Sequence, residues 1–113
     1  MHEVRIATEI LSIVQKEMVS RGLDSIAEIG LRIGLLSGVD PDALAFSFEA
    51  ATSGTEMERT RLVIEKIHVR AACQVCAKEF DVENYLFICP ACESTDVRVI
   101  EGEELDIVWL SSA

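Results

Sequence analysis

Four cysteines, arranged as two C-x2-C pairs, constrain this chain more than any other feature. Cys73 is paired with Cys76 and Cys89 with Cys92, and the 113-residue sequence contains no other cysteine. Two short knuckles with this spacing present four thiolates to one tetrahedral ion, which is typical of a structural zinc site. The spacing therefore predicts a metal-clamped subdomain around these pairs.

The segment between the two pairs has the composition of a β-hairpin. Residues 78–82 and 85–88 are short runs rich in apolar and aromatic side chains, and the turn-forming Glu83-Asn84 separates them. The two predicted strands would place one cysteine pair at each end of the hairpin. This arrangement is that of a zinc ribbon.

Other uses of the four cysteines fit the sequence less well. Disulfides form in oxidising compartments, and no secretory signal precedes the pairs. A C-x2-C redox pair normally lies at the end of a strand in a βαβ unit, which neither pair has around it. A rubredoxin-like iron tetrathiolate uses almost the same spacing and stays open as the alternative to zinc.

Charge excludes one common function of zinc ribbons. The chain has 20 acidic and 10 basic residues, a formal net charge of −10, and half of its residues are apolar. Residues 70–97, which would form the ribbon, contain two basic and five acidic residues. A ribbon that binds nucleic acid should be basic, so we expect no nucleic-acid partner. Cationic partners or metal ions are favoured instead.

The sequence shows no targeting or membrane-spanning segment. Charged residues interrupt every apolar run well short of the length needed to cross a bilayer. We therefore expect a cytoplasmic protein without membrane partners, in a reducing compartment where thiols remain available to zinc.

The N-terminus is a second candidate metal site. In Met1-His2-Glu3, the α-amino group, the amide nitrogen of residue 2 and the His2 imidazole can form two adjacent chelate rings on one ion. The fourth position would be left for Glu3 or another ligand. Nitrogen donors in one plane suit Ni(II) or Cu(II). From these three residues alone, a chance sequence at the start of the chain is the other interpretation.

The rest of the chain predicts two helices and a small sheet. Apolar spacing predicts a helix over residues 4–20 that buries Val4, Ala7, Leu11, Val14 and Met18. Asp40 and Pro41 mark the start of a second helix, which extends to about residue 51 and buries Leu44, Phe48 and Ala51. Strands are predicted over 26–36, 62–69, 97–100 and 105–110.

These elements predict an α/β (α+β) fold in which a small sheet packs with two helices. The cysteine segment is inserted between two predicted strands of that sheet. The expected organisation is therefore an α/β domain of residues 1–69 plus 98–113, which carries the candidate N-terminal metal site, with a zinc-ribbon subdomain of residues 70–97.

Other polar residues suggest no catalytic site. His68 is expected to be a solvated side chain, and the acidic run Glu101, Glu103, Glu104 and Asp106 a solvated turn, although both could supply auxiliary ligands. The sequence has no Walker A loop, no dinucleotide-binding glycine pattern and no nucleophile with a recognisable base. We therefore do not expect an enzyme.

Several of these motifs together resemble the HypA/HybF family of hydrogenase nickel-incorporation proteins. They are Met1-His2-Glu3 before an Ile- and Val-rich helix, the strand with Gly34 to Gly38, the segment from Phe46 to Thr55, and C-x2-C followed by C-P-x-C. The resemblance covers essentially the whole chain in the same order.

The resemblance implies a nickel metallochaperone for NiFe-hydrogenase maturation. His2 would be the nickel ligand, with the Met1 amine, the backbone around residue 2 and Glu3 completing the site. Cys73, Cys76, Cys89 and Cys92 would hold structural zinc. The implied partners are the HypB-type GTPase of the pathway and the hydrogenase large-subunit precursor, and some relatives also serve urease.

One departure from the family concerns the zinc loops. Relatives often have a histidine beside a cysteine pair, whereas Ala77 and Glu93 follow the two pairs here. Exchange of a cysteine ligand for histidine at the zinc is therefore not expected in this chain.

Overall fold

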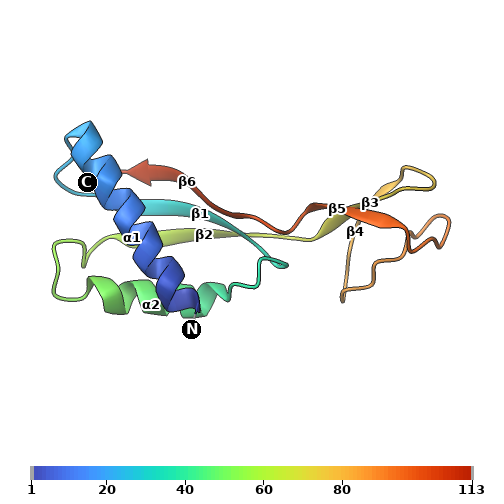
Figure 1. Ribbon diagram of the computed structural model, residues 1–113, viewed down its shortest axis with the longest axis horizontal. Helices are drawn as coiled ribbons and strands as arrows, with labels where there is room; N and C mark the ends of the chain where they lie inside the picture. The colour runs from blue at the N-terminus through green and yellow to red at the C-terminus, as the bar shows by residue number, and fades with distance from the viewer. Residues whose placement is uncertain (1, 113) are drawn as a thin grey trace.

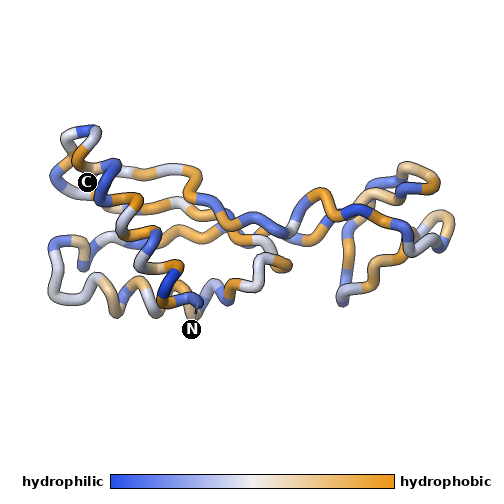
Figure 2. Tube along the Cα trace, viewed as in Figure 1, coloured by the Kyte–Doolittle hydropathy of each residue, from blue (hydrophilic) through white to orange (hydrophobic). Residues whose placement is uncertain are grey.

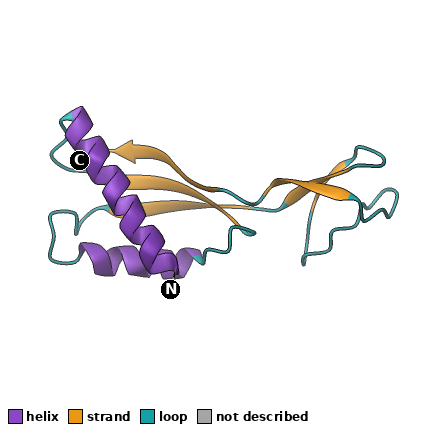
Figure 3. Ribbon diagram, viewed as in Figure 1, coloured by secondary structure: helices purple, strands orange, loops and turns teal. Residues whose placement is uncertain are grey.

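The chain forms an elongated molecule of two lobes (Figure 1). The computed structural model describes residues 2–112, and its principal extents are 54 × 28 × 17 Å. One lobe contains both helices and a three-stranded sheet of order β2-β1-β6, and the other contains a second sheet of order β4-β3-β5 (Figure 3). The elements are α1 (His2–Arg21), β1 (Glu28–Gly34), α2 (Pro41–Thr52), β2 (Arg61–Ile67), β3 (Arg70–Cys73), β4 (Glu79–Asp81), β5 (Val97–Glu101) and β6 (Leu105–Ser111).

The helical lobe is a two-layer unit built around β1. This strand is parallel to β2 and antiparallel to β6. Alternate β1 side chains, those of Ile29, Leu31 and Ile33, are almost fully buried and share one core with apolar residues of both helices. Figure 2 shows the corresponding hydrophobic stretches along these strands. The α+β fold with two helices and small sheets is thus confirmed.

Helix α1 begins two residues earlier than predicted, so that it includes His2 and Glu3, and its buried stripe is rotated. Ile10 is 5% exposed, whereas Val4, predicted to be buried, is 47% exposed. Leu11 is only partly buried. The buried positions are Ala7, Ile10, Val14 and Met18. Because apolar residues occupy more than half of the circumference of α1, periodicity alone did not determine which side faces the sheet.

Helix α2 begins as predicted at the Asp40 cap. The Asp40 side chain accepts hydrogen bonds from the N–H groups of Asp42 and Ala43 at 3.0 and 3.4 Å, and Pro41 is the first helical residue. The last buried residue of α2 is Thr52, and Ala51, predicted to be buried, is exposed. Thr52 can be buried because its hydroxyl donates to the Phe48 carbonyl at 2.9 Å and so needs no hydrogen bond to water.

The second sheet corrects two strand predictions. Val97–Glu101 pairs with β3 and not with the sheet of the helical lobe. Residues 79–81 form β4, which also pairs with β3, whereas residues 85–88 form no strand and the predicted hairpin is wrong. The turn after β4 is present, with positive φ angles at Asn84 and Tyr85 and a hydrogen bond from the Leu86 N–H to the Glu83 carbonyl.

Two short links join the lobes and contact each other closely. His68 and Val69 lead from β2 to β3, and residues 102–104 lead from β5 back to β6. The Leu36 N–H donates to the Gly102 carbonyl at 2.7 Å, and a Cβ on Gly34 would clash with the same oxygen. Glycine is therefore required at position 34 for the links to approach β1. The division into two domains stays a prediction.

Among residues 2–112, neither helix combines the length and the apolar character that crossing a membrane requires.

Candidate metal centres

The four cysteines converge in the strand-only lobe. Their sulfur atoms all lie within 4.8 Å of one another, and the Cys73–Cys92 and Cys76–Cys89 sulfurs are each 3.5 Å apart. Zn–S bonds of 2.3 Å in a tetrahedron place sulfurs about 3.8 Å apart. The cluster therefore fits one tetrahedral zinc ion without rearrangement of the backbone.

The two cysteine pairs have the same backbone geometry. The Cys73 N–H donates to the Lys78 carbonyl at 2.8 Å, and the Ala77 N–H donates to the Cys73 carbonyl at 3.0 Å. In the second pair, the Cys89 N–H donates to Ser94 and the Glu93 N–H donates to Cys89, both at 2.9 Å. Each loop is thus a closed knuckle that fixes its two sulfurs.

Each knuckle turns through a residue in the left-handed region. Ala77 has φ 68° and Glu93 has φ 62°. These are the two residues that follow the cysteine pairs, where glycine would adopt the same conformation at lower cost. The knuckles therefore carry conformational strain at both positions.

Hydrogen bonds within the knuckles shift the thiol pKa values. The Cys76 N–H lowers the pKa of Cys73. In the second knuckle the Cys92 N–H lowers the pKa of Cys89 to about 6. For Cys92 the Ser94 N–H lowers the pKa, but hydrogen bonds with the other thiols outweigh it and raise the pKa to about 12. The cluster alone thus keeps a proton that a bound zinc ion would displace.

The N-terminal candidate residues lie on the helical lobe, where α1 begins and close to the start of α2. His2 is the first residue of α1, its side chain is 59% exposed, and its Nδ1 lies 3.5 Å from a Glu3 carboxylate oxygen. The same oxygen accepts a hydrogen bond from the Asp40 N–H at 3.2 Å, which lowers the Glu3 pKa. Met1 lies outside the described residues.

The structure therefore groups the predicted site residues into two separate centres. Figure 1 places the N-terminus on the helical lobe and the cysteine loops in the other lobe. His68 is exposed and belongs to the link between β2 and β3 rather than to either centre. The contact between the Asp40 N–H and Glu3 was not predicted, because 37 residues separate them and no local pattern links them.

A comparison with protein-family models matches residues 1–111 to "Hydrogenase/urease nickel incorporation, metallochaperone, hypA". The chain belongs to the HypA family. Hydrogenase maturation factor HypA of Geobacter metallireducens is 45% identical over 107 residues, which cover 95% of this chain and 94% of the relative. The HypA of Chloroflexus aurantiacus is 39% identical over 113 residues, 99% of each chain. The family resemblance predicted from the motifs is confirmed.

Solved HypA structures have the same fold. The solution structure of a HypA protein aligns with a TM-score of 0.73 and 21% identity, covering 100% of this chain and 97% of that one. The solution structure of the nickel metallochaperone HypA from Helicobacter pylori aligns with a TM-score of 0.66 and 19% identity, covering 97% and 96%. The family is one of nickel metallochaperones, and the four-cysteine cluster of this member is compatible with structural zinc.

Proposed function

We propose that this protein binds Ni(II) through Met1, His2 and Glu3 and delivers it during NiFe-hydrogenase maturation. The observation that carries the proposal is the exposed His2 imidazole at the start of α1, with its Nδ1 beside the Glu3 carboxylate. Cys73, Cys76, Cys89 and Cys92 would hold structural zinc in the other lobe. The protein would act by metal transfer and not by catalysis.

In the proposed nickel site, backbone nitrogens supply metal ligands that side chains do not provide. Among residues 2–112, no group of three or more His, Cys, Asp or Glu ligand atoms gathers around His2. The His2 amide, however, lies in the first turn of α1, where N–H groups have no acceptor within the helix. Ni(II) can displace this amide proton, and the Met1 amine would complete two chelate rings with the His2 Nδ1. Planar nitrogen ligation favours Ni(II) over Zn(II).

Glu3 would complete or tune this chelate. Its carboxylate is 19% exposed and is oriented by the Asp40 N–H at the start of α2. An ionised carboxylate beside the imidazole compensates the positive end of the helix dipole, which otherwise disfavours a cation at this position. The hydrogen bond from the Asp40 N–H lowers the pKa of Glu3 and so favours the ionised carboxylate.

A terminal chelate suits transfer because its open edge is accessible to incoming ligands. We infer that a HypB-type GTPase and the hydrogenase large-subunit precursor exchange nickel with this site in the cytosol, with urease factors as further clients. Protonation of the amine, whose usual pKa is only about a unit above neutrality, and of the imidazole would assist release.

A nickel titration of zinc-loaded protein with its native N-terminus tests the binding step. We expect about one Ni(II) per chain, and loss of this binding in His2→Ala. His68→Ala is the matched control, since it removes an exposed histidine that belongs to neither centre. Equal binding by His2→Ala, together with loss in His68→Ala, would refute the N-terminal site.

A transfer assay tests delivery. Nickel-loaded protein is mixed with hydrogenase large-subunit precursor in the presence of a chelator that captures free nickel, and nickel in the precursor is measured. Wild-type protein should transfer nickel under these conditions, whereas free nickel should be lost to the chelator. If both sources load the precursor equally, the protein is not a delivery factor.

A further inference from the structure

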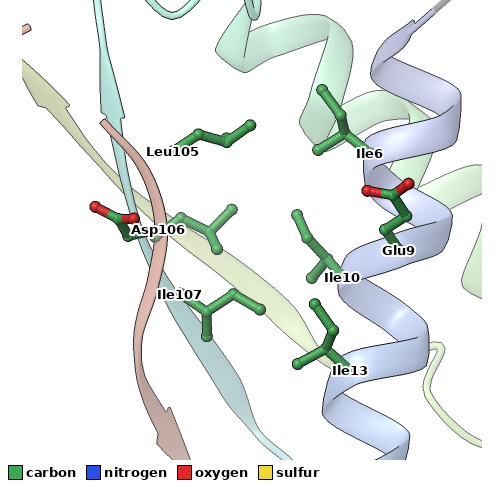
Figure 4. Close-up of a pocket in the computed structure, with 8 residues that line it drawn as sticks. Ile6, Glu9, Ile10, Ile13, Leu105, Asp106 and Ile107 are labelled. Carbon is green, nitrogen blue, oxygen red and sulfur yellow. The ribbon is translucent and has the colours of Figure 1, made fainter. Parts of the chain in front are cut away.

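A groove of about 370 Å³ lies between α1 and β6, and none of the candidate metal ligands lines it. Ile6, Ile10 and Ile13 line it from the helix, and Leu105 and Ile107 line it from the strand. Figure 4 shows these side chains pointing toward one another across the gap. Ile10 is buried, but Ile13 is 50% exposed and Leu105 is 41% exposed, so the groove is open to solvent along its outer side.

The strand wall of this groove is a sheet edge. Within residues 2–112, β6 has β1 as its strand neighbour on one side and no strand on the other. Its outer backbone groups are therefore available for pairing with another strand. Val108 and Trp109, on the same strand, are 47% and 42% exposed. A long edge strand with exposed apolar side chains is a typical site for strand addition.

Two carboxylates flank this apolar edge. Glu9 lies on the helix wall between Ile6 and Ile10, and the Asp106 carboxylate points to the side of β6 away from α1 (Figure 4). A strand added beside β6 would direct alternate side chains to these two sides. One set would enter the apolar groove, and the other would lie beside Asp106.

We propose that the β6 edge and the α1–β6 groove bind an extended segment of a protein partner with alternating apolar and basic residues. The apolar residues fill the groove beside Ile10 and Ile13, and the Lys or Arg residues on the opposite side pair with Asp106. A second copy of this chain fits poorly, because it would bring the same carboxylates and a net charge of −10 to the interface.

The position of the groove connects this surface with nickel transfer. Ile6 follows His2 by four residues, so the groove begins one helical turn, about 6 Å along the axis, from the imidazole. A segment bound there would hold its own protein against the N-terminus. This use of the surface rests on the proposed nickel function, whereas the binding itself does not require nickel.

The test uses nickel-free, zinc-loaded, ¹⁵N-labelled full-length protein and an eight-residue peptide of alternating valine and lysine. NMR titration should show saturable shifts at residues 6–13 and 105–111. A peptide with glutamate in place of lysine should bind about tenfold more weakly or not at all. Equal binding of the two peptides, or shifts elsewhere, would overturn the proposal.

Matched variants separate the groove from general effects on α1. Ile13→Asp should weaken peptide binding about tenfold, whereas Val19→Asp, on the same helix at a position 84% exposed, should not. His2→Ala should bind the peptide normally, so failure of the nickel site would not affect this result. If the free chain is instead a dimer that Ile13→Asp dissociates and that binds no peptide, a second copy occupies the edge and the proposal is wrong.

Discussion

Glycine at the two strained knuckle positions should tighten zinc binding. Ala77 and Glu93 adopt φ angles of 68° and 62°, where a side chain costs ~1–2 kcal/mol. Glycine also gives the unfolded chain more conformational freedom, which offsets ~0.4–1 kcal/mol of the strain that is relieved. The net gain is then ~0.5–1 kcal/mol per knuckle, and ~1–2 kcal/mol for Ala77→Gly combined with Glu93→Gly.

This gain should appear directly as zinc affinity, because closing the knuckles and binding the ion are one process. A gain of ~1–2 kcal/mol corresponds to a rise in affinity of about 5- to 30-fold. The assay is competition for zinc with a chelator of known affinity, using wild-type protein, each single variant and the double variant at one pH.

A control separates conformation from charge. Glu93→Ala removes the carboxylate next to the cluster but keeps the Cβ that causes the strain. It should therefore bind zinc nearly as the wild type does. The explanation by backbone strain fails if the double glycine variant shows no gain, or if Glu93→Ala gains as much as Glu93→Gly.

Two further predictions concern the links and the N-terminus. Gly34→Ala should destabilise the protein by ~3 kcal/mol, because its Cβ would clash with the backbone carbonyl of Gly102. Gly30→Ala faces the half-exposed Trp109 ring and should cost only ~1 kcal/mol. Similar free energies of unfolding in urea for the two variants would contradict this. The Glu3 pKa lies below its usual 4.5 because the ionised carboxylate accepts a hydrogen bond from the Asp40 N–H. This hydrogen bond therefore stabilises the fold fully above pH 4.5, and the stabilisation is lost as the pH falls through the lowered pKa. Glu3→Gln should accordingly lower the Tm of nickel-free protein at neutral pH, and this loss should shrink as the pH falls below the usual Glu value of 4.5. A loss of Tm that stays constant as the pH falls would refute it.

Local signals predicted the parts of the structure that local interactions determine. The C-x2-C pairs predicted the four-sulfur cluster because each knuckle closes through hydrogen bonds within six residues. Asp40 followed by Pro41 predicted the start of α2 for the same reason. These signals need no knowledge of distant contacts.

Non-local pairing explains the predictions that failed. Tyr85 to Ile88 has the composition of a strand, but its side chains are largely exposed and β4 pairs with β3 instead. Val97–Glu101 joins the second sheet through a pairing that sequence patterns do not specify. The contact between Glu3 and the Asp40 N–H likewise depends on how α1 and α2 pack.

In the proposed nickel site, Ni(II) binds at a chelate that includes the terminal amine. The most direct test compares nickel affinity at neutral pH for protein with a free N-terminus and for the same protein acetylated there, which removes the amine but leaves His2 and Glu3 in place. Acetylation should lower the nickel affinity by at least about tenfold, a loss of ~1.4 kcal/mol or more in binding free energy. Equal affinity of the two forms would contradict it.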